Sequence, residues 1–162
     1  MRKPCRMLFL IGSLAAGWLS WSAPAASQGG RKVVPKLVPI AETKLLMEGL
    51  AHANFRGLER HLKQKPTEDQ AWTFARGQAL LLAETANLLM LRPPRNEGES
   101  AWFERAMDLR STAARLAQAA GKRDYAASRA GFVDVANACN RCHQTFKVKV
   151  LITPFEEAEG SP

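Results

Sequence analysis

Apolar residues recur every three or four positions through most of the chain, which is the period of an amphipathic α-helix. Two stretches show this period most strictly. The first contains Trp72, Ala75, Ala79, Leu82, Ala86 and Leu89, and the second contains Trp102, Ala106, Leu109, Ala113, Leu116 and Ala120. No stretch alternates apolar and polar residues as a β-strand does. The pattern predicts an all-α protein whose helices pack through these two seams.

Helix-ending signals divide the pattern into four helices. The first is expected from about Ile40 to Lys63, because a proline at 66 disfavours helical geometry at the residue before it. Its inward face is predicted to carry Ile40, Met47, Leu50, Asn54, Leu58 and Leu62. The second helix begins at Thr67, because residues 67–70 have the form of a capping box, and it stops at the two prolines at 93 and 94.

The third helix starts near Asn96 or Gly98 and ends at Gly121, since glycine adopts a left-handed conformation without penalty. Asp124 caps the fourth helix, and Pro154 ends the helical region. The inward seam of the fourth helix is predicted to contain Tyr125, Ser128, Phe132, Val135, Cys139, Cys142 and Phe146. Short loops between four helices predict an antiparallel four-helix bundle over residues 40–150, followed by a flexible tail at 151–162.

The first residues have the pattern of a secretory signal. Three basic residues precede a short apolar run from Met7 to Trp21, and small residues follow it around Ala23 and Ala25. An uncleaved membrane anchor is the alternative, but the run is short for a span of about 20 residues. We therefore expect residues 1–26 to be removed, residues 27–39 to form an extended lead-in, and no stable membrane insertion.

The net charge of +8 falls to +5 when residues 1–26 and their three basic side chains are removed. The remaining basic residues are scattered, with no basic run or aromatic platform, which argues against nucleic-acid binding. A moderately basic protein can dock on an acidic redox partner. A mixed, solvated surface explains the same charge equally well.

The segment Cys139-Asn140-Arg141-Cys142-His143 carries the clearest chemistry. It reads C-x-x-C-H, the attachment motif of a c-type haem. On a helix the two thiols share one face and can each add to a haem vinyl group, while the adjacent imidazole can ligate the iron. A disulfide is the first alternative, but it would be strained on a helix. Zinc is the second, but it requires about four ligands and no second cysteine pair exists. Alanines along the seams leave volume that a haem can fill.

With this motif on its last helix, the chain resembles the cytochrome c′ family, the class II c-type cytochromes, over about residues 38–150. Phe146 and Lys147 match the aromatic and basic positions that follow the family's motif, although arginine is commoner at the second. The late position of the motif is also typical, since most other c-type cytochromes carry it near the N-terminus.

The resemblance implies one covalent haem c, with Cys139 and Cys142 as its anchors and His143 as the proximal iron ligand. It implies that the first helix supplies the distal side, where Met47 is either the sixth ligand or a core residue. A basic residue near the propionates is often found four positions earlier. Here that position is a threonine with Lys44 beside it, which departs from the pattern. Family members often form homodimers through the first two helices.

Other residues have competing interpretations. Lys44, Arg141 and Lys147 can contact propionates or tune the proximal histidine, or they can be solvated, and Arg141 is expected to be exposed. His52 and His61 are alternative sixth ligands, but both are expected at the surface or its boundary. Four further large side chains are interpreted as core residues: Met90, Met107, Trp72 and Trp102.

These features predict an exported monohaem cytochrome that carries single electrons between periplasmic redox partner proteins. The alternative is a five-coordinate haem protein that binds nitric oxide or carbon monoxide. A haem-free bundle with a disulfide is a third interpretation. No catalytic carboxylate pair or Ser-His-Asp signature is present, so an enzyme is not expected.

Overall fold

The computed structural model describes residues 36–95 and 98–155. The predicted signal peptide, most of the lead-in and most of the tail lie outside the described residues. Residues 36–39 are exposed and have no regular secondary structure. Within the described ranges, no helix combines the length and apolar character that a membrane crossing requires.

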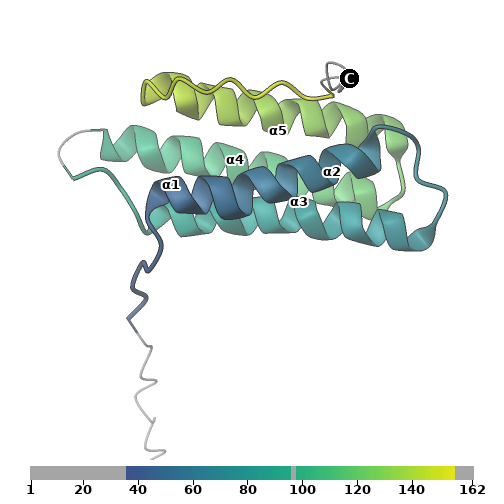
Figure 1. Ribbon diagram of the computed structural model, residues 1–162, viewed down its shortest axis with the longest axis horizontal. Helices are drawn as coiled ribbons and strands as arrows, with labels where there is room; N and C mark the ends of the chain where they lie inside the picture. The colour runs from purple at the N-terminus through teal and green to yellow at the C-terminus, as the bar shows by residue number, and fades with distance from the viewer. Residues whose placement is uncertain (1–35, 96–97, 156–162) are drawn as a thin grey trace, which may run out of the picture. The chain divides into compact units, whose positions relative to one another are not determined.

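The first helical rod is continuous and consists of α1 (Thr43–Leu46), the π-helix η1 (Met47–His52) and α2 (Ala53–Leu62). It is followed by α3 (Asp69–Met90), α4 (Glu99–Gly121) and α5 (Tyr125–Thr145). Figure 1 shows the four rods side by side, each running opposite to the one before it. The prediction of an all-α antiparallel four-helix bundle is confirmed.

The two strict seams form the centre of the core. All six predicted positions of α3 are buried, and in α4 only Trp102 remains partly exposed. Of the seam of α5, Ser128, Phe132 and Val135 are buried, and Cys139 packs against the core from its edge. Small seam residues allow close approach, since a Cβ added at Gly131 would lie 3.4 Å from the Leu116 side chain.

The face of the first rod was only partly predicted. Ile40 is 90% exposed and precedes the helix, while Leu46 and Phe55 are buried and were not on the predicted face. Phe55 precedes Leu58 by three residues and Leu62 by seven, and both of these predicted positions are fully buried, so Phe55 shares their face of α2. Phe55 thereby turns inward and stacks on Phe132, with ring centroids 4.4 Å apart.

Helix ends also differ from the predictions. The capping box at Thr67 is wrong, because α3 begins after Glu68 and no side chain caps it. Asp124 caps α5 as predicted and accepts a hydrogen bond from the Ala127 amide at 3.0 Å. α4 ends at Gly121, but the left-handed residue is Arg123, with φ 57°.

α5 ends at Thr145, well before Pro154, so the predicted extension of helix is wrong. Lys147 is left-handed, with φ 57°, and the Val148 amide bonds to the His143 carbonyl at 2.8 Å. This is the pattern of a Schellman ending, which reverses the chain. Residues 148–155, which we call the C-terminal strap, then run back along α5.

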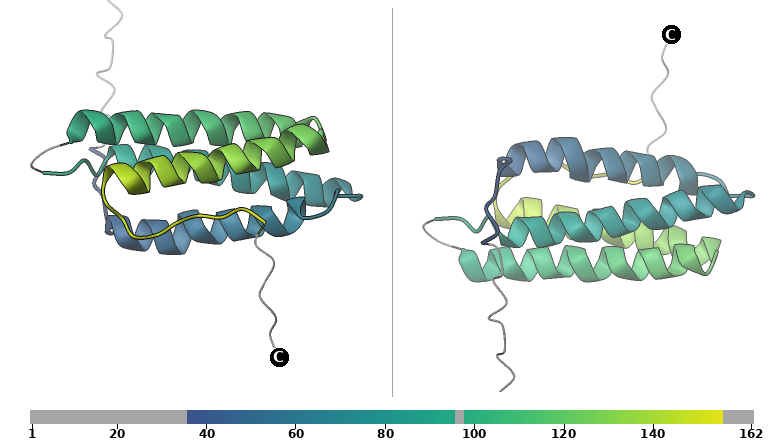
Figure 2. Two further views of the ribbon diagram at one scale, coloured as in Figure 1. Left: turned by 90° about the horizontal axis from the view of Figure 1, so that it is seen from above. Right: turned by 90° about the horizontal axis from the view of Figure 1, so that it is seen from below.

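The strap covers the least packed side of the bundle. α4 packs extensively on α3 and α5, whereas α5 makes only slight contact with α2. The left view in Figure 2 shows the strap crossing between α5 and the first rod. Its last residue, Phe155, contacts both Phe132 of α5 and Glu59 of α2.

Two glycines allow a test of backbone strain. Gly98 has φ +85°, whereas Gly77 lies inside α3 with open space around its Cα. We expect Gly98→Ala to lower the free energy of unfolding by about 1–2 kcal/mol, because an L-residue is strained there. Gly77→Ala should raise it by up to about 1 kcal/mol through helix propensity. Urea unfolding followed by circular dichroism measures both, and an unchanged midpoint for Gly98→Ala would contradict the assigned conformation.

Candidate functional site

One end of the bundle gathers the predicted site residues. The Arg92 side chain of the α3–α4 connection donates to the Ala41 carbonyl at 3.0 Å, and Trp102 of α4 donates to Leu89 of α3 at 2.7 Å. Trp102 also meets Phe146 edge-on at 5.1 Å. The start of the first rod, the end of α3, the start of α4 and the end of α5 therefore lie together (Figure 1). Met47 and the motif at 139–143 share this end.

The two cysteines of the motif are free, half-buried thiols on α5. Burial, together with the neighbouring Cys142, raises the pKa of the Cys139 thiol to about 12. Burial also raises the pKa of Cys142, and the Arg105 charge opposes this rise. Both sulfurs are thus neutral thiols at neutral pH. Their position on a regular helix is the one in which a disulfide between them would be strained.

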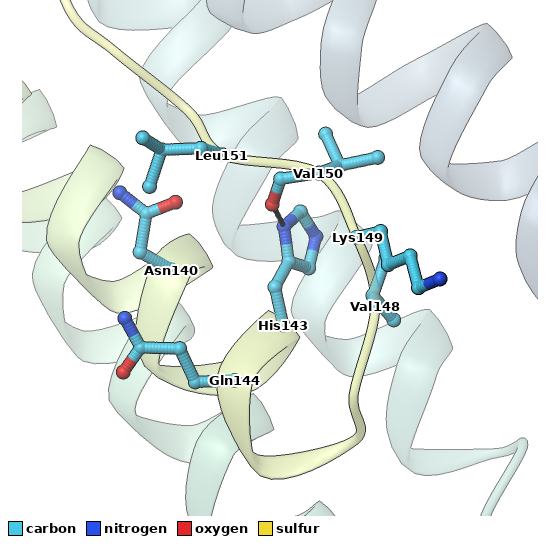
Figure 3. A pocket seen from close by; sticks show the side chains of 7 residues that line it. All are labelled: Asn140, His143, Gln144, Val148, Lys149, Val150 and Leu151. Atoms are coloured by element: carbon cyan, nitrogen blue, oxygen red, sulfur yellow. Dashed lines mark hydrogen bonds between the residues drawn. The ribbon is translucent and has the colours of Figure 1, made fainter.

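His143 is oriented by a hydrogen bond from the far side of its ring. Its Nδ1 lies 2.8 Å from the carbonyl oxygen of Val150 in the C-terminal strap (Figure 3). A carbonyl only accepts, so in the neutral ring Nδ1 carries the proton and Nε2 is the nitrogen that can bind a metal. Among the described residues, Nε2 has no hydrogen-bond partner. This is the arrangement in which a histidine offers one nitrogen to a metal and fixes its ring through the other.

Asn140, inside the motif, joins the same segment. Its amide donates to the Ile152 carbonyl at 2.9 Å and accepts from the Ile152 amide at 2.8 Å. A pocket of about 240 Å³ lies between α5 and the strap (Figure 3). It is smaller than the roughly 300–1,000 Å³ of typical ligand pockets. The pocket therefore reflects the seating of the strap and is not a cofactor cavity in itself.

The donor set fits a covalently attached haem. Two free thiols lie three residues apart on one helix, and the adjacent imidazole keeps one nitrogen without a partner in the described parts of the chain. In the parts of the chain that the structure describes, no group of three or more His, Cys, Asp or Glu side chains could hold a metal ion.

Sequence reasoning missed the charged residues that α4 contributes. Asp108 forms an ion pair with Arg141 at 2.7 Å, so Arg141 is exposed as predicted but is also tied to α4. Arg105 lies near enough to Cys142 to affect its pKa, and its Nε is buried without a partner. In both pairs the residues are more than thirty positions apart in the sequence. The periodicity of apolar residues does not indicate such long-range contacts.

Met47 is the first residue of η1 and packs, half-buried, against the core. Met47 and His52 are the two ends of this π-helix. His52 is exposed, as expected. His61, near the opposite end of the bundle, stacks on Phe74 at 5.9 Å.

The other candidates have local roles in the structure. Lys44 is exposed, and its amino group lies 3.8 Å from Glu48 on the same helix. Lys147 is the left-handed residue that ends α5. Met90 packs against the core as predicted, but the core interpretation of Met107 is wrong, since Met107 is 47% exposed.

A family model described as Cytochrome C′ matches residues 97–147. The matched segment contains α4, α5 and the complete C-x-x-C-H motif. Over this segment the chain is similar to the cytochrome c′ family. No curated protein shows significant sequence similarity to it. Members of the cytochrome c′ family are haem c proteins, which agrees with the donor set of α5. The first rod and α3 lie outside the matched residues, so the position of Met47 is known from the structure alone.

The buried thiols give a reactivity test on haem-free, folded protein. At pH 9 an ordinary thiol is about half ionised, whereas a pKa of about 12 leaves on the order of one Cys139 thiol in a thousand as thiolate. We expect iodoacetamide to modify Cys139 at least ~10-fold more slowly than in denaturant, with Cys142 less protected. Mass spectrometry of the modified peptides measures both rates. Equal rates for Cys139 in folded and unfolded protein would contradict its burial.

The raised pKa of Cys139 also determines how the stability of the fold changes with pH. The pKa of Cys139 is higher in the folded state than its ordinary value of 9.0, so the unfolded thiol ionises first as pH rises. The free energy of unfolding that comes from burying the neutral Cys139 thiol is fully present below pH 9 and is lost as pH rises toward 12.

Proposed function

We propose that the chain is an exported c-type cytochrome with one haem attached through Cys139 and Cys142 and ligated by His143. The single observation that carries the proposal is the orientation of His143, whose Nδ1 is bonded to Val150 while Nε2 has no partner among the described residues. The two free thiols, which are three residues apart on α5, also support the proposal. When bound, haem supplies the one-electron chemistry of its iron. The protein residues anchor it, orient the imidazole and shield it from water.

Electron transfer is the function that Met47 favours. This half-buried methionine lies at the same end of the bundle as His143, and thioether ligation stabilises six-coordinate iron and raises its potential. The second candidate, binding of nitric oxide or carbon monoxide, is supported by the packing of Met47 against the core, which would leave the sixth position open. Neither candidate assigns a catalytic residue.

The location and partners follow from the sequence. Residues 1–26 have the pattern of a cleaved signal, so we place the mature protein in the periplasm. Its moderately basic charge suits an acidic redox partner protein. A homodimer through the first two helices, and propionate contacts by Lys44 and Lys147, remain predictions from the family resemblance.

Covalent attachment is tested by expressing the chain with haem-maturation machinery. We expect a mass gain of one haem that resists acid extraction, and loss of this gain in Cys139→Ser/Cys142→Ser. Asn137→Ala, on an exposed position of the same helix, is the control and should keep the haem. A correctly processed but colourless wild-type protein would overturn the proposal.

The sixth ligand is tested by absorption spectra of both oxidation states. We expect a low-spin wild type that becomes high-spin and binds carbon monoxide in Met47→Ala, because the thioether is removed. Met90→Ala removes another half-buried methionine at the end of α3 and should leave the spectrum unchanged. A wild type that is already high-spin and binds carbon monoxide would favour the gas-binding candidate.

A further inference from the structure

We infer that Asn140 is a positioning residue for the proximal histidine. It holds the C-terminal strap in the register that places the Val150 carbonyl on His143 Nδ1. The inference rests on the proposed function, because its consequence is exerted on haem iron through His143. It assigns a role to a variable position inside the C-x-x-C-H motif and to a segment beyond the residues that match the family.

The spacing of residues on α5 and in the strap allows Asn140 and His143 to bond to the strap at the same time. Asn140 and His143 are three residues apart on α5 and therefore lie on one face, about 4.5 Å apart along the axis. Ile152 and Val150 are two residues apart in the extended strap, about 6.6 Å, and their carbonyls point the same way. Because the strap runs opposite to α5, Asn140 pairs with Ile152 while His143 pairs with Val150. A slip of one residue would turn the Val150 carbonyl away.

Apolar packing does not fix this part of the strap. Val148, Val150 and Leu151 are 47%, 53% and 74% exposed. Only Ile152 packs against the core between the turn at Lys147 and the last two residues. The two hydrogen bonds of Asn140 therefore decide the register where the histidine contact is made.

The far end of the strap has its own anchor. The Phe155 amide donates to the buried Glu59 carboxylate, which also pairs with Arg56 at 2.7 Å. The Phe155 ring lies 5.0 Å from that of Phe132, and the Arg129 guanidinium lies 3.8 Å from its centroid. With this end fixed on α2 and α5, release of Asn140 would loosen the middle of the strap without freeing the whole segment.

The hydrogen bond at Nδ1 affects the metal side of the ring. A histidine that donates from one nitrogen is a stronger electron donor at the other, and its ring plane is fixed. Substitution at position 150 does not remove a backbone carbonyl. The hydrogen bond between His143 Nδ1 and the Val150 carbonyl is therefore controlled by Asn140, which fixes the position of that carbonyl.

The test compares haem-loaded Asn140→Ala with wild type. We expect the amides of Ile152 and its neighbours to exchange hydrogen at least ~10-fold faster, and the reduction potential to become more positive because His143 donates less. Asn137→Ala, exposed and one turn earlier on α5, is the matched control and should change neither. Ile152→Pro removes the amide donor from the opposite side and leaves the motif intact. It should reproduce the faster exchange at the neighbouring amides and the shift in potential, and the double variant should add little.

Three results would overturn the inference while the haem function stands. In the first, the strap amides are unchanged in Asn140→Ala. In the second, the amides are released but the potential stays at the wild-type value. In the third, both Asn140→Ala and Ile152→Pro lose their haem, which would assign the strap to attachment. A colourless wild-type protein, by contrast, would overturn the proposed function itself.

Discussion

The close packing of α4 between α3 and α5 is the constraint on which the rest of this structure depends. Alanine seams let these helices approach closely, and the burial of apolar seam residues stabilises the arrangement. This packing leaves α5 with only slight contact to α2, so one side of the bundle needs another covering. The C-terminal strap covers that side, and the motif at 139–143 faces the same region from the end of α5.

The strap connects the fold to the chemistry. The left-handed turn at Lys147 reverses the chain directly after the motif, which brings Val150 onto His143. A left-handed lysine is less favourable than glycine by about 1–2 kcal/mol, so the tertiary bonds of the strap have to offset this local cost. The hydrogen bonds of Asn140 and Glu59 to the strap, and the cation–π contact of Arg129 with Phe155, provide this stabilisation. The similarity of residues 97–147 to the family model and the orientation of His143 are independent observations that support the proposed haem attachment.

Helix α4 contributes charged side chains next to the motif. Arg105 lies near Cys142, and Asp108 holds Arg141. Lys44 pairs with Glu48 on the surface of its helix, and Lys147 is the residue at which the chain reverses after α5. The charged surface near the motif is therefore formed where α4 packs on α5. These two helices are also the part of the chain that matches the cytochrome c′ family model.

The sequence by itself determined the helices of α3 and α4, their seams, the Asp124 cap and the motif, because periodicity and capping are local properties of neighbouring residues. Only the tertiary structure decided that Phe55 stacks on Phe132, since this contact joins residues of two helices that are far apart in the sequence. It also decided the end of α5 and the path of the strap. These depend on bonds such as Asn140 to Ile152 and Phe155 to Glu59, which join residues distant in sequence and leave no repeating pattern in it.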